Sequence, residues 1–203
     1  MLDSHVRPLI DPPLNAVARI LAKTGASANM LTAIGFGFSL CAFAALVFQA
    51  YGTAILFIAL SRLMDGLDGP LARQSQATDR GGYFDIVSDF IFYSGIVFFF
   101  AVGRPDMALP AAFLIFSFVG TGSSFLTYAI FATKRGINHD RQGRKAFFYL
   151  GGLTEGTESI AALALVCLFP DYFFWTAYIF GGLCWLTTLG RTAQAVKDFG
   201  RAP

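Results

Sequence analysis

The chain has 203 residues, of which 55% are hydrophobic, only 14% are charged and 23 are phenylalanine. Soluble domains carry about 25% charged residues, so this composition excludes an ordinary soluble protein and indicates an integral membrane protein. The net charge is only +2, and we expect no nucleic-acid partner.

The N-terminal segment has the pattern of an amphipathic helix. Asp11 can cap a helix that Pro12 begins. Apolar residues then recur at helical spacing: Leu14, Val17, Ala18 and Leu21. We expect residues 12–23 to lie in the cytoplasmic membrane interface, with Arg19 and Lys23 facing anionic head groups. The alternative is a helix in a solvent-exposed tail.

Six further segments are long and apolar enough to cross a bilayer, which takes about 20 residues of helix. They are residues 30–50, 52–73, 82–102, 107–132, 146–169 and 172–190. No linker or repeat separates a second unit. We therefore predict one all-α domain over residues 1–203, with six transmembrane helices after the interfacial helix.

The basic residues fix the orientation that we expect. Nearly all of them fall on one side of these spans: Arg7, Arg19, Lys23, Arg73, Arg80, Lys134, Arg135, Arg141, Arg144, Lys145, Arg191, Lys197 and Arg201. Only Arg104 falls on the other side. Because cytoplasmic loops are enriched in Lys and Arg, both termini are predicted to be cytoplasmic.

Four aspartates lie inside the second and third spans, near the cytoplasmic turn between them. At ~1.5 Å rise per residue, Asp68 lies level with Asp85, and Asp65 lies level with Asp89. Within each helix the i, i+3 or i, i+4 spacing puts the pair on one face. Four carboxylates at one depth repel one another unless a cation lies between them. Oxygen ligands favour a hard ion, Mg²⁺ or Mn²⁺.

Small residues accompany the aspartates. Gly66, Gly69 and Ala72 leave a groove along the second span, and Gly81 and Gly82 open the third. A flat ligand or another helix can then approach the backbone closely. Arg73, at the rim, could pair with a phosphate. Close helix packing alone is the alternative explanation of the glycines.

These positions match a known pattern. The pattern Asp65-x2-Asp68-Gly69-x2-Ala72-Arg73-x7-Gly81-x3-Asp85-x3-Asp89 resembles the signature of the CDP-alcohol phosphotransferase (phosphatidyltransferase) family. The amino-acid sequences of other segments are similar to a proteobacterial inner-membrane branch of this family, whose acceptor is not assigned. The resemblance implies transfer of a phosphatidyl group from a CDP-linked donor, which we expect to be CDP-diacylglycerol, to an alcohol, with release of CMP. It also implies a homodimer.

The resemblance assigns roles to the aspartates. Asp65, Asp68 and Asp85 are expected to hold two divalent ions, Mg²⁺ or Mn²⁺, on the donor pyrophosphate. Asp89 is expected to be the general base that takes the acceptor's proton, while also touching one ion. The donor's CDP group is expected in the groove, whose residues by resemblance are Asn29, Thr32, Asp65, Gly66, Asp68, Gly69, Ala72, Arg73 and Gly81. For Asn29 and Thr32, ordinary N-capping of the first span is an equal alternative.

The acceptor site is less defined by the sequence. Glu155 and Glu158 fall inside the fifth span, where they either pair with Arg62 at matching depth or face the acceptor. A basic loop could bind an acceptor phosphate through Lys134, Arg135 and Arg144, or only reflect the topology.

The residue after the last aspartate leaves the acceptor open. In the family that this chain resembles, phosphatidylglycerophosphate synthases usually carry a lysine at this position, and inositol-phosphate synthases often carry an arginine. This chain has Phe90. Both acceptors therefore remain alternatives. A protein of another class, a divalent-cation transporter, is also an alternative, because carboxylates inside a membrane can line an ion path.

Overall fold

The structure is a computed structural model that describes residues 3–74, 78–136 and 152–200. Within these ranges all regular structure is helical, as predicted. The helices are α1 (Asp3–Lys23), α2 (Ala28–Val47), α3 (Tyr51–Gln74), α4 (Asp79–Gly103), η1 (Pro105–Met107), α5 (Ala108–Lys134), α7 (Gly156–Leu168), η3 (Pro170–Tyr172) and α8 (Phe173–Phe199).

Four helical segments are long and apolar enough to cross a membrane: α2, α4, η1 with α5, and η3 with α8. Helix α3 is also long, but it carries Arg62, Asp65, Asp68 and Arg73. Helix α7 has 13 residues. The four apolar segments agree with four of the six predicted spans, and the crossing of the bilayer by α3 and α7 stays a prediction.

The first helix begins earlier than the sequence indicated. It starts at Asp3 instead of Pro12 and continues through three prolines. Proline fixes φ near the helical value, so the helix can pass through it at the cost of one N–H donor each time. The side-chain amide of Asn15 donates to the Asp11 carbonyl at 2.7 Å in this stretch.

The fifth predicted span is not one continuous helix. Residues 152–155 are irregular, residues 146–151 lie outside the described part, and α7 begins at Gly156. Glu155 is the N-cap of α7 and forms a capping box with Glu158. The two glutamates thus satisfy backbone N–H groups at a helix start, whereas the sequence placed them within a helix.

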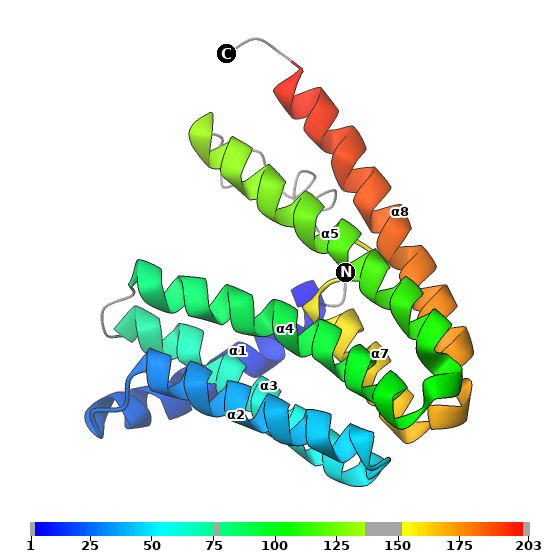
Figure 1. The fold of residues 1–203 in the computed structure, drawn as a ribbon. Coiled ribbons are helices and arrows are strands. Elements are labelled where there is room, and N and C mark those ends of the chain that lie inside the picture. Colours follow the sequence, from blue (N-terminus) through cyan, green and yellow to red (C-terminus); the bar gives the residue numbers. More distant parts are fainter. Residues whose placement is uncertain (1–2, 75–77, 137–151, 201–203) are drawn as a thin grey trace.

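Helix α2 packs against both α3 and α4, α1 lies against α3, and α5 and α8 lie side by side with their C-terminal ends at the same end of the molecule (Figure 1). Aromatic contacts join these groups. Phe43 stacks on Phe99 between α2 and α4, with ring centroids 4.9 Å apart, and Phe100 stacks on Phe173 of η3–α8 at 4.2 Å. The buried core therefore runs along α4, which lies between helices α1, α2 and α3 on one side and α5, α7 and α8 on the other.

The end of the molecule that holds the α2–α3 and α4–α5 connections is stabilised by polar contacts. Gln49, at a positive φ of 55°, donates from Nε2 to the Gly103 carbonyl at 2.8 Å. Arg104 pairs with Asp106 at 3.2 Å and with Asp171 at 3.3 Å. Arg104 thus ties the start of α5 to the start of α8.

Gly103 provides a test of the α2–α4 contact. A Cβ added at Gly103 would overlap the Leu46 carbonyl, which belongs to the backbone and cannot rotate away. We expect Gly103→Ala to lower the free energy of unfolding by about 1–3 kcal/mol. Gly182→Ala is the matched control, because its Cβ meets no atom within 4 Å. Thermal unfolding in detergent measures both, and equal melting temperatures would contradict the close contact.

Candidate active site

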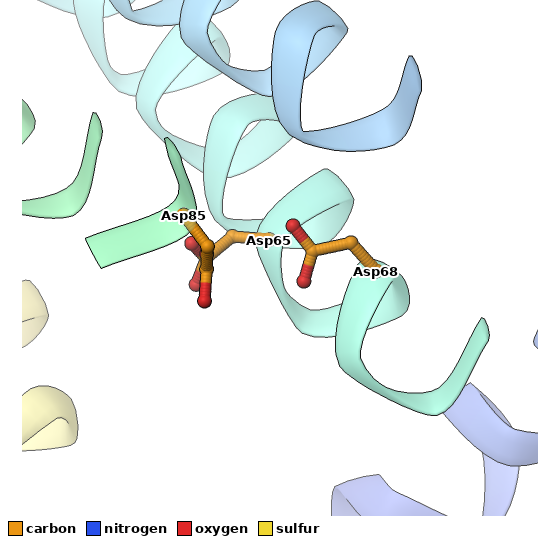
Figure 2. A group of neighbouring side chains, drawn as sticks. All are labelled: Asp65, Asp68 and Asp85. Atoms are coloured by element: carbon orange, nitrogen blue, oxygen red, sulfur yellow. The ribbon is translucent and has the colours of Figure 1, made fainter. Parts of the chain in front are cut away.

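Three of the four aspartates converge where α3 and α4 face each other. Asp65 and Asp68 project from α3 and Asp85 from α4, and Figure 2 shows their side chains directed toward one another. One carboxylate oxygen of each lies within 4.8 Å of the others. Asp68 is buried, with 6% exposure, and the other two are half-buried. The sequence prediction of facing carboxylates at matching depth agrees with this arrangement.

Helix α2 packs against α3 next to the aspartate cluster. At Gly35, α2 comes so near α3 that an added Cβ would lie 3.1 Å from Met64 Cβ and 3.3 Å from the Ser61 carbonyl. This approach brings Thr32 next to the cluster, and its hydroxyl donates to Asp68 Oδ2 at 2.6 Å. Thr32 therefore contacts the aspartates directly. Ser27, whose side chain accepts from the Met30 amide, caps α2.

The three carboxylates could hold a divalent ion. Their oxygens are hard ligands, they converge from two helices, and one of them is fixed by a hydrogen bond. Three like charges this close are unfavourable in an apolar helix pair without a cation. The residues present therefore fit the Mg²⁺ or Mn²⁺ that the sequence suggested.

Asp89 lies apart from this group. Its Oδ1 accepts a hydrogen bond from Arg62 Nη1 at 2.5 Å. The same nitrogen lies 3.4 Å from Asp65 Oδ2. Arg62 is thus paired with Asp89 on α4 and with Asp65 on α3. Among the described residues this pairing disfavours the alternative in which Arg62 pairs with Glu155 or Glu158. The i, i+3 spacing of Arg62 from Asp65 was the signal in the sequence that indicates the pair.

An open groove of about 200 Å³ adjoins the cluster. It is lined by Ser27, Ala28, Asn29, Thr32, Asp68, Gly69, Ala72, Thr78, Gly81, Gly82 and Asp85. The N-termini of α2 and α4 both border it. Ser27 caps the first, and Thr78 caps the second by accepting from the Gly81 amide at 3.1 Å. Free N–H groups and helix dipoles at such ends favour an anionic ligand such as a phosphate.

Most of the predicted donor-binding residues line this groove: Asn29, Thr32, Asp68, Gly69, Ala72 and Gly81. Gly66 does not line the groove but faces α1. A Cβ added at Gly66 would lie 3.3 Å from Leu14 Cδ1, so this glycine allows α1 to pack closely on α3. Asp65 lines a smaller hollow beside Arg62. Arg73 Nη1 lies 3.6 Å from the position of a Cβ on Gly69, near the groove but not in its wall.

Sequence reasoning missed three residues of the wall: Ser27, Ala28 and Thr78. Two of them carry a recognisable signal, since a Ser or Thr directly before an apolar helix is a preferred N-cap. The sequence around each cap could have identified both helix starts as anion-binding positions.

The residues expected at the acceptor site are spread over several elements. Lys134 and Arg135 lie at the C-terminal end of α5, where Arg135 donates to the Asp198 carbonyl at 3.4 Å. Glu155 and Glu158 lie at the start of α7. Arg144 lies outside the described residues. The sequence analysis did not select Arg191, which is 8% exposed and donates to the Thr121 carbonyl at 3.1 Å.

Comparison with known proteins decides the family. The family model for CDP-alcohol phosphatidyltransferase matches residues 26–189. The chain belongs to this family. It is 47% identical over 192 residues to the inner membrane protein YnjF of Escherichia coli, covering 94% of this chain and 93% of the relative.

Two other relatives carry names that state an activity. The archaetidylinositol phosphate synthase of Pyrococcus horikoshii is 34% identical over 101 residues, which is 49% of this chain and 54% of the relative. The crystal structure of Mycobacterium tuberculosis phosphatidylinositol phosphate synthase with CDP-DAG bound matches with a TM-score of 0.65. That match has 15% identity and covers 90% of this chain and 93% of the other, so it shows the shared fold.

The family membership has consequences for the sequence-based expectations. The resemblance noted from the aspartate motif is confirmed, and the chain is a membrane-bound transferase of phospholipid biosynthesis. A relative in the E. coli inner membrane agrees with the apolar helices observed here. The family also favours group transfer over the alternative of a divalent-cation transporter.

Gly81 provides a test of the groove. A Cβ added there would lie 2.5 Å from Asn29 Oδ1 and 3.1 Å from Thr78 Oγ1, where the two helix starts meet. We expect Gly81→Ala to raise the Kd for CDP-diacylglycerol about tenfold, a loss of ~1.4 kcal/mol. Gly37→Ala, whose Cβ meets no atom within 4 Å, is the control. An unchanged Kd for Gly81→Ala would show that donor does not bind in this groove.

Proposed function

We propose that the protein transfers a phosphatidyl group from CDP-diacylglycerol to the hydroxyl of an alcohol and releases CMP. The observation that carries the proposal is the position of Asp65, Asp68 and Asp85 beside a groove bordered by two helix N-termini. Such a site suits a pyrophosphate, because it offers an ion-binding cluster and backbone N–H groups together.

The donor assignment is supported by a solved relative. The mycobacterial structure of the same fold has CDP-DAG bound. In this chain the groove has small residues at Gly69, Ala72 and Gly81, which leave the backbone open to a flat group. We place the cytidine there, the pyrophosphate at the aspartates, and Arg73 near the phosphates.

The chemistry is a displacement at the phosphorus that carries the diacylglycerol. The acceptor oxygen forms a bond to this phosphorus while the bond to the CMP oxygen breaks, and CMP leaves with the electron pair. Asp65, Asp68 and Asp85 would hold a divalent ion, which would draw charge from the pyrophosphate oxygens. Asp89 takes the hydroxyl proton. Its Oδ1 is held by Arg62, and its Oδ2 has no hydrogen-bond partner among the described residues.

The acceptor enters beside Asp89. The residue after it, Phe90, packs on α5, where an added Cβ on Gly122 would overlap its ring. An apolar contact thus fills the place of the cation expected in glycerophosphate or inositol-phosphate synthases. Two relatives are named as inositol phosphate synthases, so a polyol phosphate is the first acceptor class to test. Lys134, Arg135, Glu155 and Glu158 are the residues that we assign to its recognition.

We further place the active site and both termini on the cytoplasmic side of a bacterial inner membrane. This orientation rests on the one-sided distribution of Lys and Arg. The basic face of α1 faces the lipid head groups in this arrangement, with Arg19 and Lys23 exposed. A homodimer is proposed from the family alone.

The role of Asp89 can be tested directly. We expect Asp89→Asn to reduce alcohol-dependent CMP release by at least ~10²-fold, because the base is lost, while donor binding stays nearly unchanged. Asp68→Asn should instead weaken metal-dependent donor binding about tenfold or more. Asp79→Asn, exposed in the first turn of α4, is the control with wild-type behaviour. Wild-type turnover by Asp89→Asn would refute the base assignment.

The acceptor can be identified by testing candidate alcohols one at a time. The purified protein is incubated with CDP-diacylglycerol, Mn²⁺ or Mg²⁺, and one alcohol at a time, and CMP is measured. We expect release with a polyol phosphate such as glycerol phosphate or inositol phosphate, and none without an alcohol. Absence of CMP release with every alcohol, together with Mn²⁺ uptake into proteoliposomes, would support the transporter in place of the transferase.

A further inference from the structure

Arg62 places a permanent positive charge inside the aspartate cluster. A guanidinium stays protonated at all pH values that proteins meet. Its Nη1 contacts Asp89 Oδ1 and lies 3.4 Å from Asp65 Oδ2, so one nitrogen bridges the two carboxylates. These are two of the carboxylates that a second divalent ion would need, because the first is held by Asp65, Asp68 and Asp85.

The surroundings hold the guanidinium in this place. Its Cζ lies 3.7 Å from the centroid of the Phe92 ring, in stacking and cation–π contact. Nη2 donates to Ser61 Oγ at 3.3 Å, and Ser61 is hydrogen-bonded to Ser39 of α2 at 2.9 Å. The Arg62 side chain is 12% exposed. Its position is therefore set by packing on three helices.

We propose that the Arg62 guanidinium replaces the second divalent ion in this protein, which then binds one metal ion per chain. The inference rests on the proposed function and changes the two-ion expectation that came from the family resemblance. Because Arg62 already contacts Asp65 Oδ2 and Asp89 Oδ1, a divalent ion between these two carboxylates could use only their other oxygens. It would also meet a like charge at short range in a site of low polarity.

The replacement gives Arg62 the role of a positioning residue. It neutralises Asp89 and holds its Oδ1, while Oδ2 has no hydrogen-bond partner among the described residues. A bound divalent ion in the same place would coordinate the base. The acceptor's proton is then taken by a carboxylate held by hydrogen bonding.

The test is the number of Mn²⁺ ions bound per chain. The full-length protein in nanodiscs is dialysed against Mn²⁺ with and without CDP-diacylglycerol, and bound metal is measured by elemental analysis and by electron paramagnetic resonance. We expect one ion in the wild type under both conditions, with the spectrum of an isolated ion. We expect two ions in Arg62→Met, with a spin-coupled spectrum, because the methionine keeps bulk and removes the charge.

Matched variants separate the causes. Arg19→Met removes one charge on α1, far from the aspartates in the chain, and should keep one ion. Asp89→Asn should also keep one ion with unchanged affinity, because Asp89 is not a ligand in the wild type. The double variant Arg62→Met with Asp89→Asn should lose the second ion again.

Three results would overturn the inference: two ions in the wild type, loss of an ion in Asp89→Asn, or a folded Arg62→Met that still binds one. The first two need no Arg62 variant, so the inference can be refuted even if that variant does not fold. Metal counting is independent of turnover. One bound ion without any CMP release would contradict the transferase proposal but agree with the one-ion inference. CMP release with two bound ions would agree with the transferase proposal but contradict the one-ion inference.

Discussion

The structure depends on how negative charge is compensated inside two apolar helices. Three carboxylates lie within 4.8 Å of one another, and a fourth is paired with a buried arginine. Charged groups in such surroundings are stable only when cations or donors lie beside them. The site thus combines one permanent cation, Arg62, with a cluster that fits an exchangeable one. The divalent ion and the CDP-linked lipid that we propose for this site would share this electrostatic arrangement.

The neighbouring helices are arranged to serve this cluster. Gly35 brings α2 against α3 and so places the Thr32 hydroxyl on Asp68. Gly66, which lies between Asp65 and Asp68 in the sequence, does the same for α1, where Leu14 packs on α3. The helix starts at Ser27 and Thr78 complete the groove with capped N-termini. Small residues near the motif therefore serve two purposes, since some open the groove and others seat a supporting helix.

Much of this could be predicted from the sequence. Helical rise and period were enough to predict that Asp68 lies level with Asp85. Each depth is counted over only a few residues from the turn between the second and third spans, so the error stays small. The partner of Arg62 was missed, since depth alone matched it to Glu155, whereas the long side chain turns along its own helix to Asp65 and across to Asp89. The start of α7 was missed because hydropathy does not distinguish an irregular segment that ends in a helix cap from a helix.

The central claim is that Asp65, Asp68 and Asp85 hold a divalent ion against a CDP-linked lipid. It is tested most directly by a crystal structure of the protein with Mn²⁺ and CDP-diacylglycerol, using anomalous scattering at the manganese edge. The account predicts one anomalous peak among the three carboxylates, in contact with the donor pyrophosphate, and Arg62 still paired with Asp89. A donor bound elsewhere, or no peak at the three aspartates, would contradict it.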